Sequence, residues 1–487
     1  IDRERGEEVA DYTMNFRLRK KDGAYTNSTE ASLSIYFYGS SNITANERAR
    51  FALPYDLLAQ VNTYKYVSAL HKDATLLRDI SVDNKHALVS VTYNNLIEKD
   101  ALIDRERGEE VADYTMNFRL RKKDGAYTNS TEASLSIYFY GSSNITANER
   151  ARFALPYDLL AQVNTYKYVS ALHKDATLLR DISVDNKHAL VSVTYNNLIE
   201  KDALIDRERG EEVADYTMNF RLRKKDGAYT NSTEASLSIY FYGSSNITAN
   251  ERARFALPYD LLAQVNTYKY VSALHKDATL LRDISVDNKH ALVSVTYNNL
   301  IEKDALIDRE RGEEVADYTM NFRLRKKDGA YTNSTEASLS IYFYGSSNIA
   351  ANERARFALP YDLLAQVNTY KYVSALHKDA TLLRDISVDN KHALVSVTYN
   401  NLIEKDALID RERGEEVADY TMNFRLRKKD GAYTNSTEAS LSIYFYGSSN
   451  ITANERARFA LPYDLLAQVN TYKYVSALHK DATLLRD

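Results

Sequence analysis

The chain has 487 residues, with 63 Lys and Arg against 67 Asp and Glu, 39 Tyr, and neither Cys nor Trp. The lack of Cys excludes disulfide frameworks, thiolate metal sites and Cys nucleophiles. A net charge of −4 without a prominent run of like charge gives no reason to expect binding to nucleic acid or to an anionic membrane. No apolar run approaches the roughly 18 residues that a membrane span needs.

One unit of 102 residues is repeated almost without change along the chain. The segment IDRERGEEVADYTMNF begins at Ile1 and returns at Ile103, Ile205, Ile307 and Ile409. The one substitution that we find is Ala350, which stands where the other copies carry Thr. The period exceeds the roughly 20 to 50 residues of solenoid repeats, and it has the size of a small domain with its own core. We therefore expect beads on a string and not one continuous core.

In the first half of the repeat, alternating apolar and polar residues predict strands. Residues 10–18 alternate in this way, and Asp22-Gly23 behind them predicts a turn. Residues 32–37 alternate next and end in turn residues, and residues 49–53 form a short segment that stops before a proline. Three strands are thus expected before residue 54.

The second half of the repeat predicts more strands. Residues 64–70 alternate, residues 75–82 lead to a hairpin turn, and residues 86–97 are rich in β-branched and aromatic residues, which is typical of a central strand buried on both faces. The alternative is a short helix within residues 55–70, because Leu57, Leu58 and Val61 keep helical spacing. Six or seven short strands in about 100 residues favour an all-β fold, an immunoglobulin-like β-sandwich.

The domain boundaries are expected in the stretch of mixed charge around residues 98–110, which has the composition of a solvated connector. This phase gives four full repeats and an incomplete fifth, at residues 1–102, 103–204, 205–306, 307–408 and 409–487. A competing phase puts the junctions after residues 79, 181, 283 and 385. The sequence leaves both phases open.

Such Cys-free, immunoglobulin-like domains in near-identical tandem resemble the stalk regions of bacterial or archaeal surface proteins. The resemblance is one of architecture and covers the whole chain. It implies an extracellular or cell-surface structural protein that forms a stalk or filament, with its length set by copy number. The partners would be other copies of the chain, joined laterally, end to end or by strand exchange. The alternative is a multivalent adhesin or carbohydrate-binding repeat that uses a Tyr-rich face, with glycans as its partners.

Two kinds of residue are candidates for these interactions. Tyr36 and Tyr38, with Tyr138 and Tyr140 in the second copy, alternate with the apolar residues of their strand, so one side should present aromatic rings outward. The other kind is the Asn of N-x-[ST] sequons in predicted turns, which would make the protein a glycoprotein if it is exported. These are Asn27, Asn42, Asn129, Asn144, Asn231, Asn246, Asn333, Asn435 and Asn450.

Sites for catalysis or metals are not expected. His71 and His86 lack the spacing of a helical zinc site, and no calcium-binding loop of the EF-hand type is present. Arg3 and Arg5 lie between the acidic residues near each junction, which favours salt bridges over a shared ion. No nucleophile elbow, P-loop, dinucleotide fingerprint or HExxH segment occurs, so the sequence predicts neither an enzyme nor a cofactor.

Overall fold

The structure is a computed structural model, and it forms two compact units, each described by itself below. One consists of residues 1–236 and 253–258, the other of residues 237–252 and 259–487. The residues that the structure describes are 9–21, 24–39, 47–53, 56–67, 71, 77–98, 103–105, 108–123, 126–141, 149–155, 158–173, 179, 181–200, 205–207, 209–243, 251–257, 260–275, 281, 283–302, 307–309, 314–345, 353–358, 362–377, 383, 385–402, 416–447, 455–457, 460 and 465–476.

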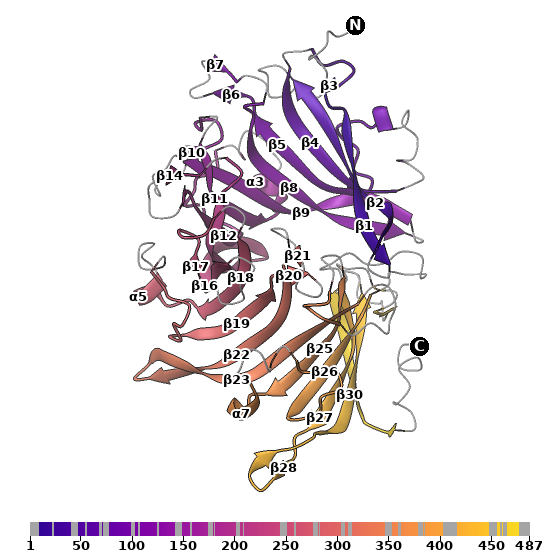
Figure 1. The fold of residues 1–487 in the computed structure, drawn as a ribbon. Helices are drawn as coiled ribbons and strands as arrows, with labels where there is room; N and C mark the ends of the chain where they lie inside the picture. Colours follow the sequence, from indigo (N-terminus) through magenta and orange to yellow (C-terminus); the bar gives the residue numbers. More distant parts are fainter. Residues whose placement is uncertain are drawn as a thin grey trace. The chain divides into compact units, whose positions relative to one another are not determined.

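The first unit holds the first two repeats and the start of the third (Figure 1). Its elements are β1 (Tyr12–Lys21), β2 (Ala24–Gly39), β3 (Glu47–Arg48), β4 (Leu57–Lys65), β5 (Leu88–Asn95), β6 (Ile97–Glu98), β7 (Ile103–Asp104), β8 (Val111–Lys123), β9 (Ala126–Gly141), β10 (Glu149–Arg150), β11 (Leu159–Lys167), α3 (Ser170–His173), β12 (Leu190–Asn197), β13 (Ile199–Glu200), β14 (Ile205–Asp206) and β15 (Val213–Lys225). The boundary between the units falls within the next strand, β16 (Ala228–Gly243).

The second unit repeats the same succession. Its elements are β17 (Glu251–Arg252), β18 (Leu261–Lys269), α5 (Ser272–His275), β19 (Leu292–Asn299), β20 (Ile301–Glu302), β21 (Ile307–Asp308), β22 (Val315–Lys327), β23 (Ala330–Gly345), β24 (Glu353–Arg354), β25 (Leu363–Lys371), α7 (Ser374–His377), β26 (Leu394–Asn401), β27 (Val417–Arg425), β28 (Lys428–Lys429), β29 (Ala432–Tyr433), β30 (Thr437–Gly447), β31 (Glu455–Arg456) and β32 (Leu465–Lys473).

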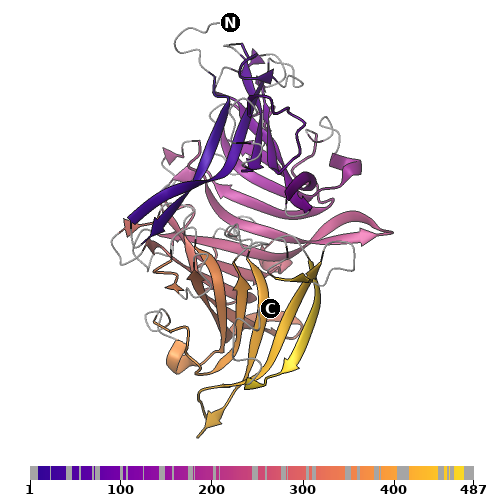
Figure 2. The same ribbon diagram turned by 90° about the vertical axis from the view of Figure 1, so that its right-hand side faces the viewer.

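The main strands of each unit pair antiparallel in one sheet. In the first unit the order is β1-β2-β4-β5-β8-β9-β11-β12-β15. In the second it is β18-β19-β22-β23-β25-β26-β27-β30-β32. A full repeat therefore supplies four main strands, of which the first two form a long hairpin, drawn in indigo for β1 and β2 in Figure 2. The prediction of an all-β fold is confirmed.

The described strands give no evidence for separate beads. The fourth strand of the first repeat, β5, pairs on one edge with β4 and on the other with β8, the first strand of the second repeat. Pairing thus continues across residue 102, and the β4–β5 pair spans the alternative junction after residue 79. An immunoglobulin-like sandwich needs two sheets packed face to face. The described strands give no support for one, because successive repeats extend the same sheet.

The described part of the charged stretch at the repeat boundary contains paired and buried residues. β6 and β7 pair there as a small ladder, and Arg105 behind them is only 3% exposed. Its guanidinium donates a hydrogen bond of 2.9 Å to the carbonyl oxygen of Ala151 and another to that of Ala154. A buried cation needs such partners, and the carbonyls come from a turn far along the chain that periodicity does not connect with Arg105.

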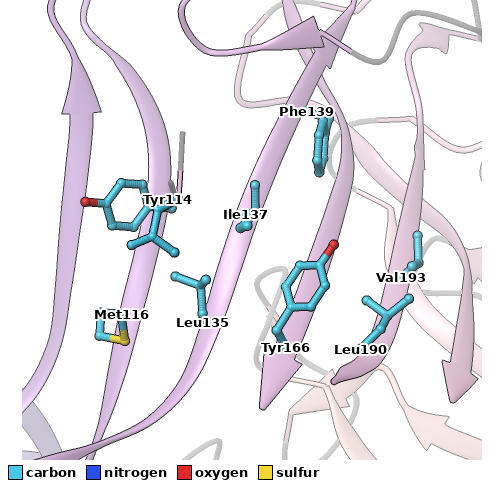
Figure 3. Close-up of a cluster of buried hydrophobic side chains, with 9 residues drawn as sticks. Tyr114, Met116, Leu135, Ile137, Phe139, Tyr166, Leu190 and Val193 are labelled. Atoms are coloured by element: carbon cyan, nitrogen blue, oxygen red, sulfur yellow. The ribbon is translucent and has the colours of Figure 1, made fainter. Parts of the chain in front are cut away.

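Each sheet has a cluster of buried apolar side chains along one face. In the first unit Leu135, Ile137 and Phe139 on β9 are at most 1% exposed, and they pack with residues of the neighbouring strands and of the segment between β11 and β12 (Figure 3). Those residues are Tyr114, Met116, Tyr166, Leu179, Leu190 and Val193. The apolar positions alternate along the strand because successive side chains point to opposite faces. The alternation seen in the sequence therefore has its expected structural meaning.

The opposite face carries a second, smaller cluster. Tyr140, on the other parity of β9, packs with Val111, Ala151 and Ala154. The two alanines belong to a turn after β10, in which the amide of Ala154 donates to the carbonyl oxygen of Arg150. The third predicted strand, residues 49–53 and their equivalents, is thus a turn that covers this face.

The remaining predictions within the repeat have mixed outcomes. The turn at Asp-Gly is confirmed at Asp226 and Gly227, where both φ angles are positive, at 51° and 82°. The helical alternative is wrong for residues 57–65, which form β4, and a single helical turn follows at α3 and its equivalents. The strand predicted at residues 75–82 is absent from its described part, where residues 77 and 78 are helical. Residues 88–95 do form a central strand, β5.

Candidate interaction surfaces

The junction between consecutive repeats combines strand pairing, stacked rings and hydrogen bonds. At the first junction Tyr93 stacks on Tyr114 with ring centroids 4.7 Å apart and planes at 26°. The hydroxyls of Thr92 and Thr115 lie 2.8 Å apart. The amide of Leu58 donates to a carboxylate oxygen of Glu110 in the next repeat at 2.9 Å, which ties the third strand of one repeat to the start of the next. Cross-strand aromatic and hydroxyl pairs of this kind stabilise sheets.

The same junction recurs in both units. Its stacked tyrosines are Tyr195 with Tyr216 in the first unit, and Tyr297 with Tyr318 and Tyr399 with Tyr420 in the second, each with centroids at 4.7 Å. Sequence reasoning singled out Tyr on β2 and missed these residues. Their signal was weak, because the two members of a pair lie in different repeats and no periodicity joins them.

The Tyr face expected on the second strand is largely covered. Tyr38 and Tyr140 are 5% and 4% exposed, and their hydroxyls donate hydrogen bonds of 2.6 Å to the carbonyl oxygens of Ala10 and Ala112. Burial also raises the pKa of Tyr140. Tyr36 and Tyr138 are half-buried, and the hydroxyl of each lies within 2.9 Å of a Thr hydroxyl on the first strand of the hairpin. Tyr140 therefore fills the small cluster described above, and Tyr38 fills the equivalent cluster with Ala49 and Ala52.

The sequons fall into two groups. Asn27, Asn129, Asn231 and Asn333 lie within strands and not in the predicted turns, and Asn435 forms an isolated bridge with His392. The side chains of Asn129, Asn231, Asn333 and Asn435 are exposed. The other sequons, at Asn42, Asn144, Asn246 and Asn450, lie outside the described residues.

His71 is a buried residue with a structural partner. It is 2% exposed, and its Nδ1 accepts a hydrogen bond of 2.9 Å from the amide of Val67. Its ring lies against Tyr64 and Tyr66, with centroids at 6.0 and 5.8 Å. Burial, together with the charge of nearby His86, lowers the pKa of His71 to about 4. Within the described residues no group of three or more His, Cys, Asp or Glu is placed to hold a metal ion.

A surface that sequence reasoning missed lies on the first hairpin of the third, fourth and fifth repeats. In the third repeat Arg221, Arg223, Lys224 and Lys225 are all exposed near the hairpin tip. Their sequence, Arg-Leu-Arg-Lys-Lys, comes directly before the Asp-Gly turn. No helix in the part of the chain that the structure describes has the length and apolar character needed to cross a bilayer.

No protein-family model matches this chain. No curated protein matches it either. Among solved structures it is similar to one described as TcdB2-TccC3-TEV, at 9% identity and a TM-score of 0.15, covering 89% of this chain and 30% of that one. A second, TcdB2-TccC3-Cdc42, aligns at 10% identity and a TM-score of 0.18, covering 97% of this chain and 26% of that one. The chain thus spans about a third or less of either, and TM-scores this low establish no shared fold.

Proposed function

We propose that this chain is a structural repeat protein that forms a stalk or filament at a cell surface, with its extent set by the number of repeats. The observation that supports this most directly is the recurrence of one junction in both units. Each repeat extends the sheet of the one before it, through the same strand register and the same stacked tyrosines. Near-identical copies then favour a role in which number matters more than variation. Extracellular placement rests on the resemblance to surface stalks.

Junctions that run through the sheet also alter how such an array is stabilised. In an array of coupled repeats, stability is a sum of repeat and interface contributions. Chains with more repeats should then unfold at higher denaturant concentration, whereas independent beads would unfold at one concentration whatever their number. Circular dichroism of chains that differ by one 102-residue repeat separates the two cases. An unfolding midpoint that does not change with repeat number would exclude the coupled array.

The functional test is made in the source cells. Antibodies against the chain should label intact cells, and deletion of one internal repeat should leave a shorter surface projection in electron micrographs. Labelling only after cells are opened would overturn the surface role. A projection of unchanged length would show that the repeats do not set its extent. The adhesin alternative receives less support, since two of its four named tyrosines are buried.

A further inference from the structure

The first hairpin of each repeat continues beyond the sheet as a two-stranded arm. In the second unit β22 pairs with β19 only as far as Asn321, opposite Ser294, whereas its pairing with β23 continues to Lys327, opposite Ala330. On the other side β23 begins to pair with β25 at Ser338. Residues 322–337 therefore form a two-stranded arm, in which the end of β22 pairs with the start of β23. Figure 1 shows this arm extending from β22 and β23, and another that ends at β28.

The base of the arm is held by the preceding repeat, and its tip is free of this contact. Lys289 donates a hydrogen bond of 2.7 Å to Glu336, and the amide of Ser334 donates to the carbonyl oxygen of Lys289 at 2.9 Å. His290 bridges to Asn333. These contacts are made by residues 332–336 of β23, so the facing end of β22 and the turn, residues 323–331, are presented on an anchored support.

Positive charge is concentrated on that tip. Residues 323–331 carry Arg323, Arg325, Lys326 and Lys327 against Asp328, which gives a net charge of +3, and all five side chains are exposed. A full repeat has 13 Lys and Arg against 14 Asp and Glu, so the rest of the repeat has 9 against 13, a net charge of −4. The small charge of the whole chain thus conceals a basic arm on an acidic body. The arms of the third and fifth repeats expose the same four cations.

The aromatic residue on the tip already has a partner. The Nζ of Lys326 lies 4.6 Å from the ring centroid of Tyr331, and the Lys224–Tyr229 and Lys428–Tyr433 pairs have the same distance. The ammonium covers one face of the ring, so the tip does not offer the open aromatic platform on which the bases of single strands stack. Recognition here would rely on ionic and charge-assisted hydrogen bonds, in which Arg pairs with carboxylates through two parallel bonds.

We propose that the arms bind a linear acidic polysaccharide, with one basic tip per repeat contacting its carboxylate groups. Two features favour this partner over nucleic acid. Each arm carries one short group of four cations, and the acidic body opposes a polymer as densely charged as duplex DNA, which carries one charge per ~1.7 Å. Repetition then raises the overall affinity, because each tip that binds brings the next into reach of the same polymer. This site is separate from the junctions on which the proposed structural role rests.

The test uses the whole chain with polygalacturonate as the probe, neutral dextran as the uncharged control and duplex DNA as the competing polyanion. Titration calorimetry should detect polygalacturonate, with binding lost near ~0.5 M salt because exposed charges are screened there. Dextran should not bind. Dextran binding as tight as that of polygalacturonate, or DNA binding more tightly than polygalacturonate at equal salt, would overturn the proposal. So would the absence of any binding to polygalacturonate at low salt.

A matched pair of variants locates the site. Lys225→Gln, Lys327→Gln and Lys429→Gln together remove one exposed cation from each of three tips and should weaken binding roughly tenfold. The control, Arg50→Gln, Arg152→Gln and Arg356→Gln, removes three exposed cations away from the arms and should change affinity less than about twofold. Equal losses in the two variants would show that net charge acts and not the arms. Because all six side chains are exposed, circular dichroism should confirm that both variants stay folded.

Discussion

The strands β25 and β32 have the same sequence, LLAQVNTYK, and different surroundings. β25 pairs with β23 on one edge and with β26 on the other, whereas the described pairing of β32 is with β30. Tyr370 on β25 is 0% exposed, and its counterpart Tyr472 on β32 is 44% exposed. Identical residues are thus core in one place and surface in the other.

The comparison teaches that burial in this protein is conferred by the neighbouring strand. Apolar and polar residues alternate in the same way along β25 and β32. The pattern therefore predicts on which face of the sheet a side chain lies, but not whether that face is covered. In β25 the cover comes from residues of β26 and from the segment between the two strands, which supplies the carbonyl groups of Val388 and Asn390. Each pair of equivalent residues is therefore a control within one molecule.

The largest effect is expected from removing the buried ring. Tyr370→Ala should lower the free energy of unfolding by roughly 3–5 kcal/mol, the usual cost of replacing a buried aromatic residue with Ala. Tyr472→Ala should cost less than about 1 kcal/mol, because its ring is already half in water. Chemical denaturation followed by circular dichroism measures both. Equal losses would mean that β32 is covered in solution and would break the comparison.

A pH-dependent effect of similar size is expected behind β25. His377 is 2% exposed, its Nδ1 accepts from the amide of Val373 at 3.0 Å, and its ring lies 6.1 Å from that of Tyr370. Burial lowers the pKa of His377 to about 4 from the ordinary 6.5. The unfolded chain thus binds the proton more readily, so this stability is complete above pH 6.5 and is lost as the pH falls toward 4.

At 1.36 kcal/mol for each pKa unit, the loss from His377 is roughly 3 kcal/mol, and His71, His173 and His275 should add similar losses. Unfolding midpoints measured between pH 7 and pH 4 should therefore fall steeply. His377→Gln should lower stability at pH 7 and make the slope shallower. A slope unchanged in that variant would show that other groups cause the acid sensitivity.

A smaller difference is expected at the polar centre of the strand. Asn368 is 0% exposed, accepts a hydrogen bond of 2.7 Å from Gln366 and donates one of 2.9 Å to the carbonyl oxygen of Val388. Asn368→Ala leaves the side-chain amide of Gln366 and the carbonyl oxygen of Val388 without this partner and should cost about 2 kcal/mol. Asn470 on β32 is only partly buried, so Asn470→Ala should stay within about 0.5 kcal/mol in the same denaturation assay. A cost above about 1 kcal/mol for Asn470 would contradict this.

These pairs also show what the sequence could and could not predict. The alternation at Leu33, Ile35 and Phe37 correctly predicted one buried face, because the side-chain period of a strand is a local property. The Asp-Gly turn was equally local. The 102-residue period gave the repeat but not its relation to the next one, since a strand edge has no signature in its own side chains. Whether β5 ends a bead or pairs with β8 depends on residues far along the chain.

For the candidate surfaces, too, the sequence predicted local features but not the contacts that distant residues make. Tyr140 does lie opposite the main core, as its alternation predicts, but it is buried because the turn at Ala151 and Ala154 covers it. The basic arm was visible as Arg-Leu-Arg-Lys-Lys. Whether this segment forms an arm depends on where pairing with the preceding repeat stops, which is at Asn321 in the fourth copy. No pattern within the segment itself predicts that point.

The smallest effect is expected at the surface ion pairs that join consecutive repeats. Lys391 donates to Glu438 at 2.8 Å across the junction that leads to β30 and β32, and this hydrogen bond is the main cause that lowers the pKa of Glu438. The side chains are 48% and 28% exposed, so water and salt weaken the attraction. Glu438→Gln should therefore cost less than about 1 kcal/mol, and the cost should shrink further in high salt.

The equivalent residue Glu30 on β2 is the control, since it is exposed and belongs to the first repeat. Glu30→Gln should change stability less than Glu438→Gln at low salt, and the two should converge at high salt, as measured by denaturation at both salt concentrations. If Glu438→Gln instead cost as much as Tyr370→Ala, the stability of the junction would depend on the Lys391–Glu438 ion pair. A small cost would indicate that strand pairing and the stacked tyrosines, Tyr399 and Tyr420, stabilise the junction.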